Sequence, residues 1–163
     1  MRAPAKVRLE RLEKLIQRIS HESEEGGVII VEGQRDRESL RTMGIGGTIL
    51  CLQSSRKNTV GFVEELVSVG NVIVLTDFDR QGVFLAKRLT RALNSQGIRG
   101  NLVLWHELRG LTRSDVRSIE ELPKFHHRLQ TEVFFGKSTV DREYETKFLA
   151  KRLEQQHQQR KMR

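Results

Sequence analysis

Near the start of the chain, apolar residues recur every three or four positions, and charged residues fill most of the positions between them. This spacing places one apolar stripe along a helix and predicts an amphipathic helix that packs on a core. Gly26 and Gly27 follow the stripe and predict where this helix ends. The apolar positions of the stripe are Val7, Leu9, Leu12, Leu15, Ile16 and Ile19.

Four later stretches are built around continuous apolar runs rich in β-formers, which predict strands buried on both faces of a sheet. They cover residues 28–31, 47–52, 71–77 and 101–105. Helical spacing returns in the segments that connect them, which are residues 34–44, 59–70 and 80–97. Strands that alternate with helices over short connections predict an α/β, Rossmann-like fold with a central four-stranded parallel sheet and right-handed crossovers.

The pattern weakens after the fourth predicted strand. We expect a helix that is capped at Thr112 or Ser114 and broken by Pro123. A polar helix that frays into a basic tail is expected beyond Phe134. The chain is therefore divided into an N-terminal helix (1–25), a core (26–107) and a C-terminal helical extension (108–163).

Acidic residues end two of the predicted strands. Glu32 follows the first strand, and Asp77 and Asp79 end the third. Strand residues at i and i+2 point to the same side, so we expect Asp77 and Asp79 to converge. Glu32 reaches the same point if the first and third strands are neighbours. Ligands of such sheets bind beyond the carboxyl ends of the strands, which is where these acids fall.

Gathering three carboxylates costs energy, because two like charges about 4 Å apart repel by roughly 4 kcal/mol at an effective dielectric of about 20. Oxygen ligands without histidine or cysteine at metal spacing favour Mg²⁺, with Mn²⁺ as a substitute. Simpler roles stay open for each residue alone. Asp79 would then cap the following helix, Asp77 would form an Asx turn, and Glu32 would hold a turn before Gly33.

The segments "VIIVEGQRD" and "VIVLTDFDRQG" together resemble the two motifs of the Toprim domain, an apolar strand ending in Glu-Gly and another ending in Asp-x-Asp-x-x-Gly. Toprim domains occur in topoisomerases, bacterial-type primases, OLD-family nucleases, recombination-repair proteins and M5-type ribonucleases. The resemblance implies a Mg²⁺-dependent phosphoryl-transfer centre. It implies that Glu32 is a general acid or base or a metal ligand, and that Asp77 and Asp79 coordinate Mg²⁺. Asp36 matches an acidic position that often follows the first motif and is interpreted as a supporting or helix-capping residue.

The charge of the chain favours an anionic partner, most plausibly nucleic acid, because 29 Lys and Arg residues outnumber 21 Asp and Glu. Arg35 and Arg80 lie beside the acids in sequence and would bind substrate phosphates or balance the carboxylates. The single cysteine, Cys51, is interpreted as a small buried residue. No apolar run of about 20 residues is present, so we expect no membrane partner and a cytoplasmic protein.

Several relatives of the Toprim type are excluded by the sequence. The only tyrosine, Tyr144, lies in the polar C-terminal segment, one cysteine cannot supply a primase zinc module, and the "GKST" at 136–139 lacks the first glycine of a P-loop. The chain most resembles the catalytic half of M5-type ribonucleases and small archaeal Toprim proteins. The expected function is therefore a ribonuclease on structured RNA such as ribosomal RNA, with RNA favoured over DNA on the resemblance alone. A non-catalytic nucleic-acid or ribosome-associated module, or a DNA repair or primase-like factor, is the alternative.

Overall fold

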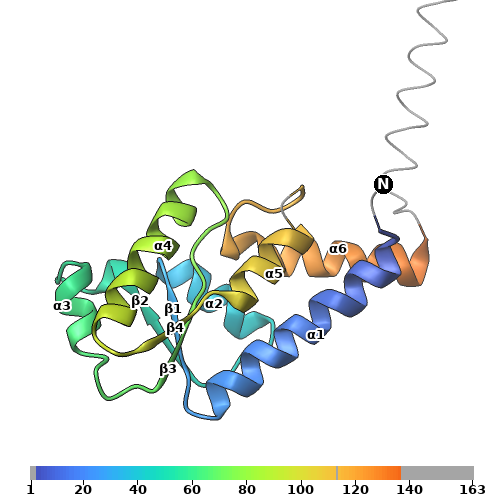
Figure 1. Cartoon of the computed structure of the whole chain (residues 1–163). Helices are drawn as coiled ribbons and strands as arrows, with labels where there is room; N and C mark the ends of the chain where they lie inside the picture. The colour runs from blue at the N-terminus through green and yellow to red at the C-terminus, as the bar shows by residue number, and fades with distance from the viewer. Residues whose placement is uncertain (1–2, 113, 137–163) are drawn as a thin grey trace, which may run out of the picture.

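The computed structural model describes residues 3–112 and 114–136, and its centre is a four-stranded parallel sheet (Figure 1). The strands are β1 (Val28–Val31), β2 (Thr48–Cys51), β3 (Asn71–Val74) and β4 (Arg99–Asn101). Their order in the sheet is β2-β1-β3-β4, and all pairs are parallel. The predicted α/β fold is confirmed, and the first and third strands are neighbours, which is the condition for Glu32 to reach the aspartates.

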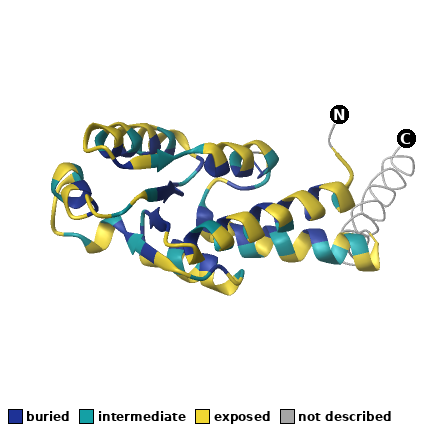
Figure 2. Cartoon of the chain, turned by 60° about the horizontal axis from the view of Figure 1, so that its bottom comes forward, coloured by how far each residue is buried: buried dark blue, intermediate teal, exposed yellow. Residues whose placement is uncertain are grey.

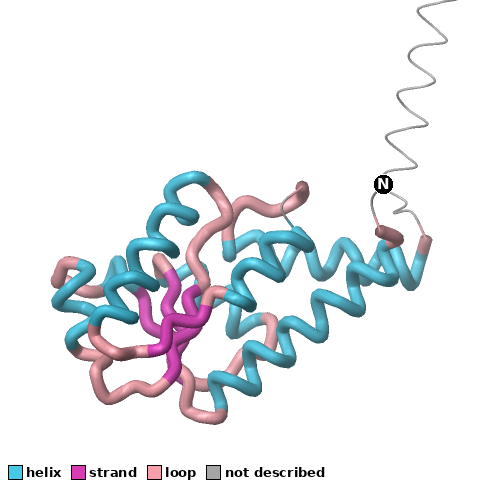
Figure 3. Tube along the Cα trace, in the orientation of Figure 1, coloured by secondary structure: helices cyan, strands magenta, loops and turns pink. Residues whose placement is uncertain are grey.

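Helices cover both faces of the sheet (Figure 3). They are α1 (Ala5–Glu24), α2 (Gln34–Thr42), α3 (Thr59–Glu64), α4 (Arg80–Ser95), α5 (Val103–Thr112) and α6 (Leu122–Phe135), with 3-10 turns η1 (Leu52–Ser54) and η2 (Ile119–Glu121). Helices α3 and α4 lie on one face, and α1, α2 and α5 lie on the other (Figure 1). In the part of the chain that the structure describes, no helix is long and apolar enough to cross a membrane.

Burial separates the two inner strands from the edge strands. All four residues of β1 are buried, and so are the last three of β3, as their unbroken apolar runs predict. The prediction that the second strand is buried on both faces is wrong, because β2 lies at an edge of the sheet and its Thr48 is exposed. Cys51 at its end is buried, as expected.

The fourth strand was predicted too late in the chain. Strand β4 comprises Arg99–Asn101, and the apolar residues that follow form helix α5. The Asn101 side chain accepts a hydrogen bond from the Val103 N–H at 2.9 Å, which forms an Asx turn directly before the helix. Leu104 and Trp105 are buried from this helix. A short apolar run does not by itself distinguish a buried strand from a buried helix, which explains the error.

The prediction that Pro123 breaks a helix is also wrong. Pro123 lies in the first turn of α6, where its missing N–H would have no partner within the helix. Residues 114–118 connect α5 to η2 without forming a helix. The polar helix and basic tail predicted after Phe135 lie outside the described residues, as does Tyr144.

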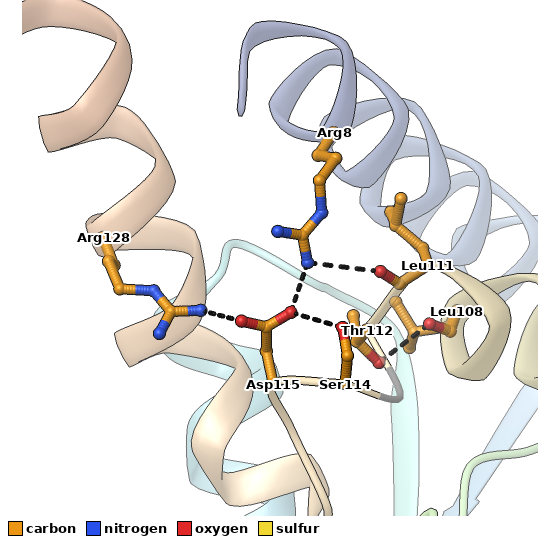
Figure 4. Close-up of polar contacts among 7 residues, drawn as sticks. All are labelled: Arg8, Leu108, Leu111, Thr112, Ser114, Asp115 and Arg128. Carbon is orange, nitrogen blue, oxygen red and sulfur yellow. Dashed lines mark hydrogen bonds and ion pairs between the residues drawn. The ribbon is translucent and has the colours of Figure 1, made fainter. Parts of the chain in front are cut away.

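Helices α1 and α6 lie side by side and extend away from the sheet, with buried residues along the faces that meet (Figure 2). Where α5 ends, Asp115 joins both helices (Figure 4). Its Oδ2 accepts a hydrogen bond from Arg8 of α1 at 2.5 Å, and its Oδ1 accepts one from Arg128 of α6. Both guanidinium groups also lie over the Phe125 ring, at 5.0 and 5.3 Å from its centroid. This polar cluster ties the 114–118 connection to α1 and α6.

Replacing Asp115 with alanine is expected to lower the free energy of unfolding by about 3 kcal/mol, because the buried Arg8 loses its carboxylate partner. Urea denaturation measures this change. Glu65→Ala is the matched control, since it breaks the exposed Lys57–Glu65 pair and should cost less than 1 kcal/mol. Equal losses in the two variants would contradict a structural role for the Asp115 cluster.

Candidate active site at the carboxyl edge of the sheet

The strand order places a topological switch point between β1 and β3. The chain leaves β1 toward β2 on one side and leaves β3 toward β4 on the other, and ligands of such sheets bind beyond the strand ends at this point. Glu32 directly follows β1, and Asp77 comes three residues after β3. The Glu32 Oε1 accepts a hydrogen bond from the Asp77 backbone N–H at 3.0 Å. The structure therefore holds these two residues together at the switch point.

The geometric reason given for Asp77 and Asp79 was wrong, although both lie at the expected edge. Strand β3 ends at Val74, so these aspartates belong to the following loop and do not alternate as strand residues. Asp77 Oδ1 accepts a hydrogen bond from the Ile119 backbone N–H at 2.8 Å. Asp79 is the N-cap of α4, and its Oδ1 accepts one from the Gly82 N–H at 2.7 Å.

Gly82 allows α4 to start directly against the loop that carries both aspartates. A Cβ at this position would lie 2.0 Å from the backbone oxygen of Asp77. The Gly82 carbonyl also accepts a hydrogen bond from the buried Thr76 hydroxyl at 2.8 Å. The final glycine of the Asp-x-Asp-x-x-Gly motif is thus required by close backbone packing.

The acidic residues line two hollows. A cleft of ≈ 490 Å³ is lined by Glu32, Asp36 and Asp77 together with Arg35, whereas Asp79 lines a second hollow together with Arg80. Asp36 has the predicted capping role, because its Oδ2 accepts a hydrogen bond from the Gly33 N–H at 2.9 Å at the start of α2. The structure therefore gathers Glu32, Asp36 and Asp77 in one cleft, which Glu120 also lines, and Asp79 lines the other hollow.

Burial and the charges of neighbouring acids raise the pKa of the Asp77 and Glu32 carboxyl groups. Burial is the main cause that raises the pKa of Asp77 to about 6, and the negative charges of Asp36, Glu32 and Asp79 add to it. The pKa of Glu32 is raised first by burial, and then by the charges of Asp36 and Asp79. Among the described residues, none of these acids forms an ion pair with a basic side chain. The site therefore gathers acidic groups with which no basic side chain of the described residues forms an ion pair.

The donor set fits a magnesium ion held by few protein ligands. Within residues 3–112 and 114–136, no group of three or more His, Cys, Asp or Glu side chains is placed to hold a metal ion. Mg²⁺ commonly takes only one or two carboxylates and completes its shell with water and substrate phosphate. Glu32, Asp77 and Asp79 each use one carboxylate oxygen in a backbone hydrogen bond. Their second oxygens make no hydrogen bond to the described residues and are available to an ion.

Two features of the cleft did not emerge from the sequence. The N–H of Ile119, which fixes Asp77, comes from 42 residues further along the chain, and no local pattern points to it. Gln53 and Ser54 line the cleft from the turn after β2. Their position did carry a signal, since they follow a predicted strand that ends at the same edge of the sheet.

In the absence of divalent cations, the raised pKa of Asp77 predicts that stability falls as the pH rises. The folded protein holds the Asp77 proton up to about pH 6, whereas the unfolded chain releases it near pH 4. This contribution is therefore complete below about pH 4 and is lost as the pH rises through about 6. The Asp77→Asn variant lacks this contribution. Its free energy of unfolding should therefore rise relative to that of the wild type as the pH increases from about 4 to about 6. Urea denaturation in chelator between pH 4 and 7.5 measures the difference, and parallel curves would contradict the prediction.

The curated relatives that match the chain carry one family name. No family model matches the chain. It is 36% identical over 125 residues to the UPF0292 protein of Methanosarcina acetivorans, which covers 76% of this chain and 85% of that protein. It is 40% identical over 115 residues to the UPF0292 protein of Methanocaldococcus jannaschii, covering 69% and 88%. A solved structure of a protein from Aquifex aeolicus matches 66% of this chain and 94% of its own, with a TM-score of 0.56 and 27% identity.

Proposed function

The chain belongs to the UPF0292 family, and we propose that it is a magnesium-dependent protein of the Toprim type that cleaves phosphodiester bonds in nucleic acid. The observation that carries the proposal is the hydrogen-bonded pair of Glu32 and Asp77 at the switch point, in a cleft whose acids have no basic partner among the described residues. A purely structural role would not require such repulsion, because acids that only cap helices need not converge on one cleft.

In the proposed chemistry, the residues of the two hollows have different roles. Bound at the carboxylates, Mg²⁺ would supply Lewis-acid stabilisation of the charge that develops on the phosphate. Asp77 and Asp79 would hold the ion through the oxygens that remain after their backbone contacts. Glu32, whose pKa is raised by burial, would take or return a proton through its second oxygen.

Arg35 and Arg80 are proposed to bind the phosphates of the substrate. Each is exposed, and Arg35 lines the cleft of Glu32 and Asp77 while Arg80 lines the hollow of Asp79. Neither forms an ion pair with any residue that the structure describes. They are therefore not engaged in balancing the acids, and their guanidinium groups suit bidentate contact with phosphate.

Structured RNA is the first substrate to test, since the resemblance to M5-type ribonucleases favours it over DNA. The experiment incubates the protein with labelled RNA hairpins and DNA duplexes in Mg²⁺, in Mn²⁺ and in chelator, beside an Asp77→Asn, Asp79→Asn double variant. Cleavage that requires the metal and is lost in the variant supports the proposal. Binding that persists in both proteins without cleavage of any substrate would overturn it and favour a non-catalytic binding module.

A further inference from the structure

A basic region lies between α1 and α5, away from the acidic residues of the candidate active site. It is a hollow of ≈ 870 Å³ whose α1 side carries Arg11, Lys14 and Arg18. These residues are three and four positions apart, so they lie on one side of the helix. Arg18 is held by Glu107 of α5, with its Nη1 at 3.0 and 2.8 Å from the two carboxylate oxygens. Arg11 and Lys14 are exposed and form no ion pair with the described residues.

This hollow and the one that contains Asp79 share one lining residue. It is Ser114, in the connection that follows α5. The second hollow, of ≈ 570 Å³, is otherwise strongly basic, since it is lined by Arg80, Arg109 and Arg117. None of these three arginines pairs with an acid in the described chain. Basic side chains therefore line both hollows, and together they make up a basic path beside Asp79 of the candidate active site.

Arg109 lines the second hollow and contacts the Trp105 ring. Its guanidinium carbon lies 5.4 Å from the centroid of the Trp105 ring, which fixes the plane of the group. Its Nε is buried and has no hydrogen-bond partner among the described residues. A buried donor left without a partner is costly, and an anionic ligand in the hollow would supply an acceptor nearby.

We propose that this path, defined by Arg11, Lys14, Arg109, Arg117 and Arg80, binds the phosphate backbone of a nucleic acid and leads it to the carboxylates. The inference rests on the proposed function, because it assigns a route to the substrate of that site. Arginine forks match phosphate oxygens, and the path offers positive charge in a row that ends where the phosphodiester would react. Backbone contacts of this kind give affinity without reading sequence.

Removing two charges from the far end of the path tests the proposal. Binding of a labelled RNA hairpin to the full chain is measured by fluorescence anisotropy in chelator, so that no cleavage interferes. The Arg11→Gln, Lys14→Gln variant should bind roughly 20- to 60-fold more weakly at 0.1 M salt. The slope of log K against log salt concentration should become shallower by about 1.4 to 1.8, since each lost phosphate contact contributes about 0.7 to 0.9.

The matched control removes the same charge elsewhere. Lys87 and Arg91 are exposed on α4 and line neither hollow, so Lys87→Gln, Arg91→Gln should leave both the affinity and the slope near those of the wild type. Equal losses in the two double variants would overturn the path, because net charge alone would then explain binding. Failure of the wild type to bind, or displacement of RNA by poly-glutamate of equal charge at lower concentration, would overturn it as well.

The outcome for the basic path can be distinguished from the outcome for the proposed nuclease activity. Specific loss of binding in the Arg11, Lys14 variant of a protein that never cleaves would support the path and contradict the nuclease. Metal-dependent cleavage with an unchanged KM in that variant would support the nuclease and contradict the path.

Discussion

Replacing Glu32 with glutamine is expected to lower metal-dependent cleavage by about 10³-fold, within the range that general acid–base groups contribute. The variant keeps an oxygen that can accept the Asp77 N–H, so the loop that carries Asp77 stays in place. The lost property is the ability to take and return a proton at a half-buried position. Single-turnover cleavage of the best RNA substrate in Mg²⁺ measures the effect.

The same replacement is expected to leave the fold intact and to raise the free energy of unfolding at neutral pH in chelator. Burial and the neighbouring acids raise the pKa of Glu32, so its ionised form is disfavoured in the folded protein. Glu38→Gln is the control, because Glu38 is exposed on helix α2, which follows Glu32 in the chain. It should change neither the cleavage rate nor the free energy of unfolding. Unaltered cleavage in Glu32→Gln would remove Glu32 from the mechanism, whereas unfolding of the variant would show a structural role.

Replacing Gly82 with alanine is expected to cost about 3 kcal/mol of stability and to disrupt the site as well. The added Cβ would meet the backbone oxygen and carbon of Asp77 at 2.0 and 2.5 Å, so either the loop or the start of α4 must move. Such a shift would also break the hydrogen bond from the Gly82 N–H to Asp79. Thermal or urea denaturation measures the first effect, and stabilisation of the folded protein by added Mg²⁺ at pH 7.5 measures the second.

Gly61→Ala provides the comparison for that experiment. Gly61 lies in α3, and the nearest atom to an added Cβ is at 3.4 Å, which is ordinary contact. Alanine favours the helix at such a site, so a small gain in stability is expected. If Gly82→Ala behaved like Gly61→Ala, the close approach of α4 to Asp77 would not be a constraint on the site.

The inner part of the fold could be predicted from local pattern because burial there is complete. Strands β1 and β3 are apolar at nearly every position since both faces are covered, and α4 has a regular apolar stripe with Gly97 in the left-handed region beyond its end. The boundary between β4 and α5 could not be fixed in this way. An apolar run of four residues fits either state, and the side chain of Asn101 decides it by forming an Asx turn directly before the helix.

The sequence predicted those parts of the candidate site that depend on where the strands end. Glu32 and Asp77 meet because their strands are neighbours, which was the condition stated for Glu32 to reach this point. The capping role of Asp79 at the start of α4 was one of the roles that the sequence left open. The partner of Asp77 could not be predicted, because it is the backbone of Ile119, contributed by a distant turn. The basic path is likewise distributed over α1, α4, α5 and the 114–118 connection, and it exists only in the folded chain.

The hydrogen bond from Ile119 to Asp77 also sets the order in which the site can be completed during synthesis. All four strands and both glutamate and aspartate motifs precede residue 102, yet the donor to Asp77 comes from η2, which α6 follows directly. The connection before η2 is anchored through Asp115 to Arg8 near the start of the chain and to Arg128 in the middle of α6. A growing chain, which emerges from its N-terminus, therefore forms its sheet first. It closes the carboxylate cleft only when α6 has been made.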